Sequence, residues 1–440
     1  MQSLFNQKQK EIKKRERNKQ KLFFLERKKK KKTKMASLWL KLFCISLIYL
    51  NVIAKSTPHQ ETEFECVSID KQFALQHSLM KNHRIQTRPS RELLSILSTS
   101  KDDRIRKIDL KGSEKCPKGQ VPIHKPKTNN LIHPQQIPRA SRLLKQTRSR
   151  WVKKKKKNNR RKKDKNKLIS SALLSQKNKK PIHRPKLFTE THLHYAIVRT
   201  FENTTKKWRG AQALFSINKP RVVQNQFSKA WIWLNYIQGS VMSSIQFGWA
   251  VHTNLYQDDR PRLTTFWMSD NHQKGCYNAL CPGGYVQIHK SIYPGLVYDK
   301  VNVPGGKQNT VHLSVAEDPV TKNWVLTIGS IMIGYWPRQS HMAEGASEVY
   351  FGGFAGISEL SQPTTSPPMG TGDFPTKDLS RSCFMKQLKY VLSDYTVVDI
   401  NPNEVEDYVD NRKCYGLMFH KYVDYDSRET LTFGGPGGQC

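Results

Sequence analysis

The sequence has few acidic residues for its length. Its 440 residues include 35 Asp and Glu against 75 Lys and Arg, a formal net charge of +40. Most of the excess lies in two segments: residues 1–34 hold 15 basic and 3 acidic residues, and residues 117–186 hold 24 basic residues and one Asp. Neither segment has an apolar periodicity, so we interpret both as solvated chain and expect no nucleic-acid partner.

Two common kinds of catalytic motif are also missing. No Gly-x-Ser-x-Gly nucleophile elbow occurs, although a Ser, His, Asp triad assembled by the fold stays open. No second close pair of thiol or imidazole ligands accompanies Cys276 and Cys281 at a spacing that suits zinc. His192 and His194 would face the same side of a strand, but two ligands make no metal site, and we interpret them as structural. We expect no metal and no cofactor.

An apolar run at residues 42–54 lies in the segment 35–54. This segment has the shape of a secretory signal peptide that begins at Met35 and is cut after Ala54. The run is short for a membrane span of about 20 residues, and an uncleaved signal that anchors the protein is the alternative. Residues 1–34 would then be an overextended gene model or a basic tail. We expect a secreted protein without membrane contact after signal cleavage.

The eight cysteines fit an oxidising compartment. Cys276 and Cys281 close a loop short enough for a local disulfide. Cys66 with Cys116 is a further candidate pair, which would leave Cys383 free. Asn203 begins an Asn-Thr-Thr acceptor for N-glycosylation.

From residue 187 onward the chain consists of short alternating runs separated by turn residues. Residues 245–281 predict a hairpin that is broken at 258–261 and ends in the loop between the two cysteines. The other expected strands are 194–199, 211–217, 230–237, 286–289, 311–316, 324–328, 331–336 and 348–351. Many short strands without intervening helices favour an all-β fold, an antiparallel β-sandwich or barrel.

The part before this domain divides in two. Residues 60–123 are mildly polar with a short helical patch at 92–97. Residues 124–186 form a basic linker, in the kind of long unstructured stretch where proteases cut most readily. We therefore expect a prosegment, a linker that is cut to release it or that serves as a passive tether, and a β-domain at 187–440.

Several motifs in one order make the β-domain resemble the neprosin-type glutamic peptidases of plants. They are Gly248-Trp249, Leu255-Tyr256, Arg260-Pro261-Arg262-Leu263, Phe266-Trp267, Ser269-Asp270, Gly275-Cys276-Tyr277-Asn278 with Cys281, and Gly352-Gly353. The earlier segment resembles the activation peptide of that family through Cys66, Lys81-Asn82-His83, Arg88-Pro89-Ser90 and Cys116-Pro117. The resemblance implies a β-sandwich, a disulfide between Cys414 and Cys440, and a prosegment that blocks the cleft until it is removed.

The resemblance also locates the family's two catalytic glutamates, and both are replaced. The first position holds Gln246, and the second, beside the Gly-Gly motif, holds Phe354 or, in the alternative alignment, Tyr350. Glutamine can orient water and donate to an oxyanion, but none of the three residues accepts a proton as a general base does. Glu348 would lie about 20 Å from position 354 along an extended strand.

By resemblance the protein is a secreted endopeptidase that cleaves at proline under acidic conditions, and the replaced glutamates predict that this catalysis is lost. The alternative is a non-catalytic module that binds proline-rich protein or cell-wall glycan, because aromatic faces such as those of Trp231 and Trp233 suit proline rings and sugars. Plain core packing is the competing interpretation for each tryptophan. We expect a proline-containing peptide or cell-wall polymer in the cleft, and the prosegment as an intramolecular inhibitor.

Overall fold

The computed structural model describes residues 63–98, 116–125, 191–201, 205–238, 241–269, 274–338, 342–358 and 365–440. The chain divides into two compact units, Met1–Thr62 and Glu63–Cys440, and all described residues belong to the second. The expected basic tail, the signal peptide, the Asn203 acceptor and nearly all of the basic linker lie outside the described residues. The expected domain boundaries stay predictions.

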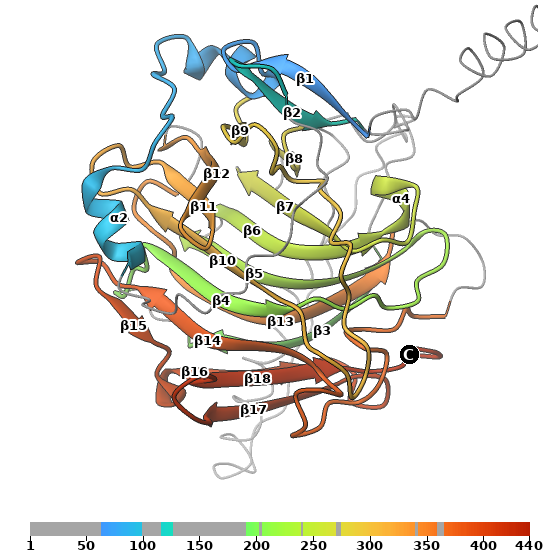
Figure 1. Ribbon diagram of the computed structural model, residues 1–440. Coiled ribbons are helices and arrows are strands. Elements are labelled where there is room, and N and C mark those ends of the chain that lie inside the picture. The colour runs from blue at the N-terminus through green and yellow to red at the C-terminus, as the bar shows by residue number, and fades with distance from the viewer. Residues whose placement is uncertain are drawn as a thin grey trace, which may run out of the picture. The chain divides into compact units, whose positions relative to one another are not determined.

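Two large antiparallel sheets confirm the predicted β-sandwich (Figure 1). The seven-stranded sheet has the order β16 (Val405–Val409), β3 (Thr191–Thr200), β13 (Glu348–Ile357), β5 (Gln226–Gln238), β6 (Val241–His252), β7 (Arg262–Ser269) and β8 (Lys274–Tyr277). The second sheet has the order β17 (Gly416–Tyr422), β18 (Glu429–Gly434), β14 (Cys383–Val391), β4 (Gly210–Ser216), β10 (Thr310–Glu317), β11 (Trp324–Ile328), β12 (Ile331–Trp336) and β9 (Val286–Gln287), with β15 (Val397–Asp399) beside β14.

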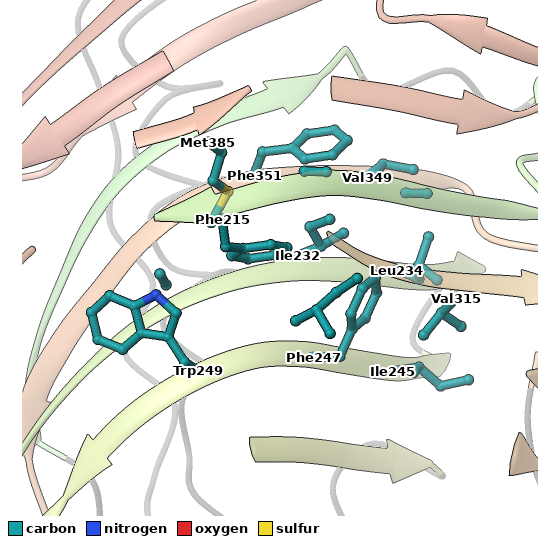
Figure 2. Packing of buried hydrophobic residues seen from close by; sticks show 14 of the residues in the cluster. Phe215, Ile232, Leu234, Ile245, Phe247, Trp249, Val315, Val349, Phe351 and Met385 are labelled. Carbon is teal, nitrogen blue, oxygen red and sulfur yellow. The ribbon is translucent and has the colours of Figure 1, made fainter. Parts of the chain in front are cut away.

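The main core fills the space between the two sheets (Figure 2). Alternate residues of β5, β6 and β13 point into it and meet residues from β4, β10 and β14 of the other sheet. The labelled members are Phe215, Ile232, Leu234, Ile245, Phe247, Trp249, Val315, Val349, Phe351 and Met385. The indole N–H of Trp249 donates to the Ser216 carbonyl at 2.8 Å, so even the polar edge of this core residue is satisfied across the interface.

Helices are few and short in the part of the chain that the structure describes: α2 (Arg91–Ser98), α4 (Thr253–Tyr256) and the 3-10 turns η1 (Phe73–Gln76), η2 (Ser78–Met80) and η6 (Pro402–Glu404). Helix α4 lies between β6 and β7, just before the predicted break at 258–261, and its first turn is capped by the His252 side chain, which accepts from the Leu255 N–H. Within the described ranges no helix is long and apolar enough to cross a membrane.

The described residues of the expected prosegment and of the start of the linker, 63–98 and 116–125, pack on the second sheet and on its β9 edge. Strands β1 (Phe64–Ser68) and β2 (Gln120–His124) pair with each other, and α2 covers the helical patch expected at 92–97. Ala74, Met80 and Leu93 join a separate apolar cluster with sheet residues that include Val325 and Tyr335. These contacts lie on the opposite side of the second sheet from the main core.

Three disulfides join Cys66 to Cys116, Cys276 to Cys281 and Cys414 to Cys440, matching the pairs that the sequence suggested. Each bond lies within the prosegment or within the β-domain, and none of them links the two. Cys383 is a buried free thiol. Burial raises its pKa to about 12, which leaves it protonated and unsuited to act as a nucleophile.

Candidate functional site

The candidate site lies on the outer face of the seven-stranded sheet, which we define as the face turned away from the main core. Alternation along β5 places Lys229, Trp231, Trp233 and Asn235 on this face while Ile232 and Leu234 point into the core. A second cluster of buried aromatic and apolar residues covers it. Its aromatic members are Tyr195, Phe227, Trp231, Trp233, Tyr256, Phe266, Tyr277, Tyr350, Phe354 and Tyr408.

Gln246, the first family position, is held in a short chain of hydrogen bonds. In the strand register it faces Trp233 on β5 and Phe266 on β7. Its Nε2 donates to Ser244 Oγ at 3.1 Å, and Ser244 Oγ donates to Asn235 Oδ1 at 2.7 Å. Gln246 is 6% exposed, so its amide is fixed and largely shielded from water.

A carboxylate that the sequence reasoning set aside lies close to this chain in the register. Glu348 on β13 faces Asn235, which in turn faces Ser244, so these three form the row next to that of Gln246. Glu348 is buried, and the Tyr350 hydroxyl donates to its carboxylate. Glu348 is far from position 354 when the distance is taken along β13 alone. Its closeness to Gln246 follows from the pairing of β13 with β5 and of β5 with β6, which a single strand does not reveal.

Phe354, the second family position, is packed among aromatic rings. Its ring stacks on Tyr195 with centroids 4.9 Å apart and lies 5.2 Å from Phe227 and 6.2 Å from Trp233. The residue is 2% exposed. The alternative position, Tyr350, lies on the same face, opposite Trp233. Neither residue supplies a proton acceptor.

Lys229, which sequence reasoning missed, faces Phe354 directly in the register. Its amino group donates to Tyr277 Oη at 2.6 Å and lies 4.1 Å from the Phe227 ring centroid and 4.5 Å from that of Trp231. Cation–π attraction of this kind stabilises an ammonium group away from water. A cation therefore stands beside Phe354, one of the two positions at which the resemblance places the second acid. The signal in the sequence was a single Lys within an apolar strand.

Two hydrogen-bond donors on this face have no partner. The indole N–H of Trp231 and the Nδ2 group of Asn235 are buried without an acceptor in the structure. Buried donors of this kind are uncommon because each loses its bond to water.

The other tryptophans and histidines considered in the sequence analysis are accounted for as follows. Trp249, Trp267, Trp324 and Trp336 belong to the main core, whereas Trp231 and Trp233 belong to the outer face. Both ring nitrogens of His194 are engaged by protein side chains, and the side chain of His192 is outside the description. Among the described residues no group of three His, Cys, Asp or Glu is placed to hold a metal ion.

Comparison with known proteins adds two family matches and several similar folds. A sequence model described as Neprosin matches residues 224–436, and one described as Neprosin activation peptide matches residues 56–199. Gln246, Phe354 and Tyr350 all lie inside the first match.

Solved structures with a similar fold include scytalido-glutamic peptidase bound to a transition state analog inhibitor, at 10% identity and a TM-score of 0.29 over 56% of this chain and 98% of that chain. SCP-B, an eqolisin peptidase in complex with the tripeptide Ala-Ile-His, matches at 10% identity and a TM-score of 0.28 over 55% and 96%. CG-16, a homodimeric agglutinin from chicken liver, matches at 9% identity and a TM-score of 0.21 over 37% and 92%. At these scores the similarity supports no argument about function.

Proposed function

The chain belongs to the neprosin family, and we propose that the outer face of its seven-stranded sheet binds proline-containing peptides without cleaving them. The observation that carries the proposal is Phe354. At a position where the family has a catalytic acid, this side chain is an apolar ring enclosed by Tyr195, Phe227 and Trp233 and placed opposite Lys229. The Phe354 ring itself cannot accept a proton to activate a water molecule.

Gln246 fits a binding role. Its amide can donate to a peptide carbonyl, as it does to Ser244 Oγ, but an amide does not take a proton from water at ordinary pH. Gln246 can thus donate a hydrogen bond to a ligand, which peptide binding requires. It cannot accept a proton from water, which catalysis requires.

The layout of β5 suits an extended peptide. Trp231, Trp233 and Asn235 lie two residues apart, about 6.6 Å for each step, which is also the spacing of alternate residues in an extended ligand. The unpartnered donors of Trp231 and Asn235 would meet backbone carbonyls, and the ring of Trp233 between them would pack against a proline ring. A glycan would also pack against the tryptophan rings, but its binding would not require hydrogen-bond donors at the spacing of alternate residues in an extended peptide.

Access to this face is limited, because Gln246 is 6% exposed and Trp233 only 3%. We expect cutting of the basic linker to increase peptide binding. Binding is to be measured on both intact and linker-cut protein.

The test is fluorescence polarisation with labelled proline-containing peptides and, in parallel, cell-wall oligosaccharides. We expect the linker-cut protein to bind the peptides and Gln246→Ala to bind them at least several-fold more weakly. Gln439→Ala, at an exposed position, is the matched control and should bind like the unaltered protein. Binding of the oligosaccharides alone, or equal binding by the two variants, would overturn the proposal.

A second candidate function has one observation in its favour, the buried carboxylate of Glu348 in the row beside Gln246. If peptide hydrolysis occurs, Glu348 is the residue that would take the proton of the attacking water while Gln246 orients it. Glu348→Gln would then abolish cleavage, and Glu344→Gln, four residues away at an exposed position, would not.

We also propose that the protein is secreted. Three disulfides in the described chain support this, because such bonds persist in oxidising compartments. Recovery of the protein from culture medium, with its N-terminus after Ala54, is the result we expect. Retention in the membrane fraction would support the anchored alternative.

A further inference from the structure

A hydrogen-bonded chain of serine, histidine and aspartate lies away from the outer face. His194 on β3 faces two partners: its Nδ1 is 2.8 Å from Asp410 Oδ2, and its Nε2 is 2.9 Å from Ser366 Oγ. Asp410 directly follows β16, and Ser366 lies in the segment between β13 and β14. Residues from three distant parts of the sequence thus meet at one histidine.

The chemistry of the groups settles the direction of these hydrogen bonds. An ionised carboxylate only accepts, so Nδ1 carries the proton and donates it to Asp410. In the neutral imidazole Nε2 is then an acceptor, and Ser366 donates its hydroxyl proton to it. This is the order of roles in which a nucleophilic serine is activated: the histidine is positioned to take the hydroxyl proton, and the aspartate holds the tautomer.

Further contacts hold each member in place. The Tyr195 N–H donates to Asp410 Oδ1 at 2.6 Å, which orients the carboxylate from its other oxygen. Ser366 is bridged to Gly438 by backbone hydrogen bonds in both directions, and the Tyr415 hydroxyl donates to the neighbouring Pro367 carbonyl at 2.7 Å. The serine is therefore fixed against its histidine by backbone and side-chain contacts together.

We infer that Ser366, His194 and Asp410 form a second reactive site, in which Ser366 is a nucleophile toward small acyl esters. In this step Ser366 Oγ forms a bond to the acyl carbon as the bond to the leaving alcohol breaks. His194 Nε2 takes the hydroxyl proton and returns it to that alcohol, and water then releases the acid by the reverse proton path. Ser366 is 6% exposed and His194 7%, so we expect only small acyl esters to react.

The site is independent of the peptide-binding face, so the two proposals fail separately. Gln246 and Phe354 point away from the main core, whereas His194 packs against the ring of Tyr415, a core member, at 5.0 Å between centroids. Loss of peptide binding in Gln246→Ala leaves Ser366 unaffected, and changes at Ser366 leave Gln246 unaffected.

The experiment treats the full secreted chain with a small fluorophosphonate and locates the adduct by peptide mass spectrometry. Here the bond from Ser366 Oγ to phosphorus forms, fluoride leaves, and His194 takes the proton. We expect one adduct per chain at Ser366, none in Ser366→Ala, and labelling at least about 100-fold slower in His194→Ala, since general base catalysis contributes about 10²–10⁴. Hydrolysis of 4-nitrophenyl acetate should fall in the same order.

Asp410→Asn and Ser382→Ala complete the series. Asp410→Asn keeps the shape but reverses the preferred tautomer, so it should slow labelling while the melting temperature stays close to that of the unaltered protein. Ser382→Ala removes another buried serine, one whose hydroxyl bonds to Thr376, and should leave the adduct unchanged. Folded protein without an adduct at Ser366, or with an adduct that forms as fast in His194→Ala, would overturn the inference.

Discussion

At the scale of single residues, the account depends on the pair Phe354 and Lys229. Each is at most 2% exposed, and they face each other across β13 and β5. The ring offers no proton acceptor, and a carboxylate in its place would be paired with the Lys229 ammonium group. We base the proposed loss of peptide cleavage on this combination more than on the change at Gln246 alone.

Phe354→Glu alone is expected to give no peptide cleavage. The new carboxylate would lie opposite the Lys229 ammonium group, and an adjacent positive charge lowers the pKa of an acid and weakens it as a base. Mass spectrometry of a proline-containing peptide library at about pH 3 to 7 is the measurement, with Phe354→Gln as the uncharged control. Cleavage by the Phe354→Glu variant and not by Phe354→Gln would contradict this prediction, because a carboxylate at position 354 would then be enough to restore peptide cleavage.

A second prediction at this scale concerns Glu63, whose carboxylate accepts from Arg260 and from Arg262 Nη1, the latter at 2.8 Å. Burial alone would raise the pKa of Glu63, but the hydrogen bonds and charges of Arg262 and Arg260 outweigh it and lower the pKa below its ordinary value of 4.5. The stability from this contact is thus complete above pH 4.5 and is lost as the pH falls through the lowered pKa. Asp258 shares the same two arginines and has a lowered pKa as well, so it acts in the same direction.

Thermal unfolding between pH 3 and 7 tests this contact. Glu63→Gln should lower the melting temperature at neutral pH and make its decline toward acid shallower. Glu65→Gln is the control, because Glu65 has only an exposed pairing with Lys125 at 3.7 Å. Parallel pH profiles for the unaltered protein and Glu63→Gln would contradict the assignment.

At the scale of elements, the close approach of neighbouring chain leaves no room for a side chain at two positions of β13. Gly352 has a φ of +142°, and a Cβ there would lie 2.3 Å from the Ala196 carbonyl oxygen. Neighbouring Gly353 would place a Cβ 2.4 Å from Met369 Sδ. The Gly-Gly motif thus serves the packing of β13 against β3 and the core, and this role would hold whether or not the sheet is catalytic.

Gly352→Ala is expected to destabilise the fold by about 1–3 kcal/mol for the backbone strain, with the clash against Ala196 adding to it. Gly372→Ala is the matched control: it also has a positive φ, +92°, but its Cβ would meet only Pro368 Cβ at 3.7 Å. Urea unfolding of both variants should place Gly352→Ala clearly below the control. Equal losses of unfolding free energy in the two variants would mean that β13 and β3 move apart to accommodate the added methyl group, and would contradict the prediction.

The sequence predicted strands best where alternation is unbroken. The expected runs at 230–237 and 311–316 fall within β5 and β10, but the strands after residue 380 were not predicted. In β14 the register shifts between Lys386 and Lys389, where Gln387 has a φ of +55°, and in β17 it shifts between Phe419 and Lys421. Such bulges break the two-residue period on which strand prediction depends.

The candidate site shows the same limit. Gln246 and Phe354 could be named from motifs, because the motifs are local in sequence. Lys229, Asn235 and Glu348 could not, since their relation to those positions depends on how β5, β6 and β13 pair. Register is a property of the sheet and not of any one strand.

At the scale of the whole molecule, the prosegment behaves as part of the fold. Gln72 Nε2 donates to the Gln287 carbonyl at 2.8 Å and its Oε1 accepts from the Gln287 N–H at 2.7 Å, which satisfies the free edge of β9. Gln86 Nε2 donates to Asp318 at 2.7 Å. Removing the prosegment would uncover a strand edge and an apolar face together.

We therefore predict that the prosegment stays bound after the linker is cut at a protease site placed within residues 153–157. Both pieces should elute together in size-exclusion chromatography at neutral pH. Leu93→Ala, at a fully buried position, should cost about 2–5 kcal/mol and reduce the prosegment recovered with the β-domain. Leu94→Ala, at 44% exposure on the same helix, should not. Separate elution of the two pieces from the unaltered protein would contradict this.

The most direct test of the central claim is incubation of the linker-cut protein with a proline-containing peptide library between about pH 3 and 7, followed by mass spectrometry. The account predicts bound but intact peptides at every pH, from protein shown to be folded. Cleavage at proline that disappears in Gln246→Ala would contradict it, because a carboxylate would then be working with Gln246 on the outer face.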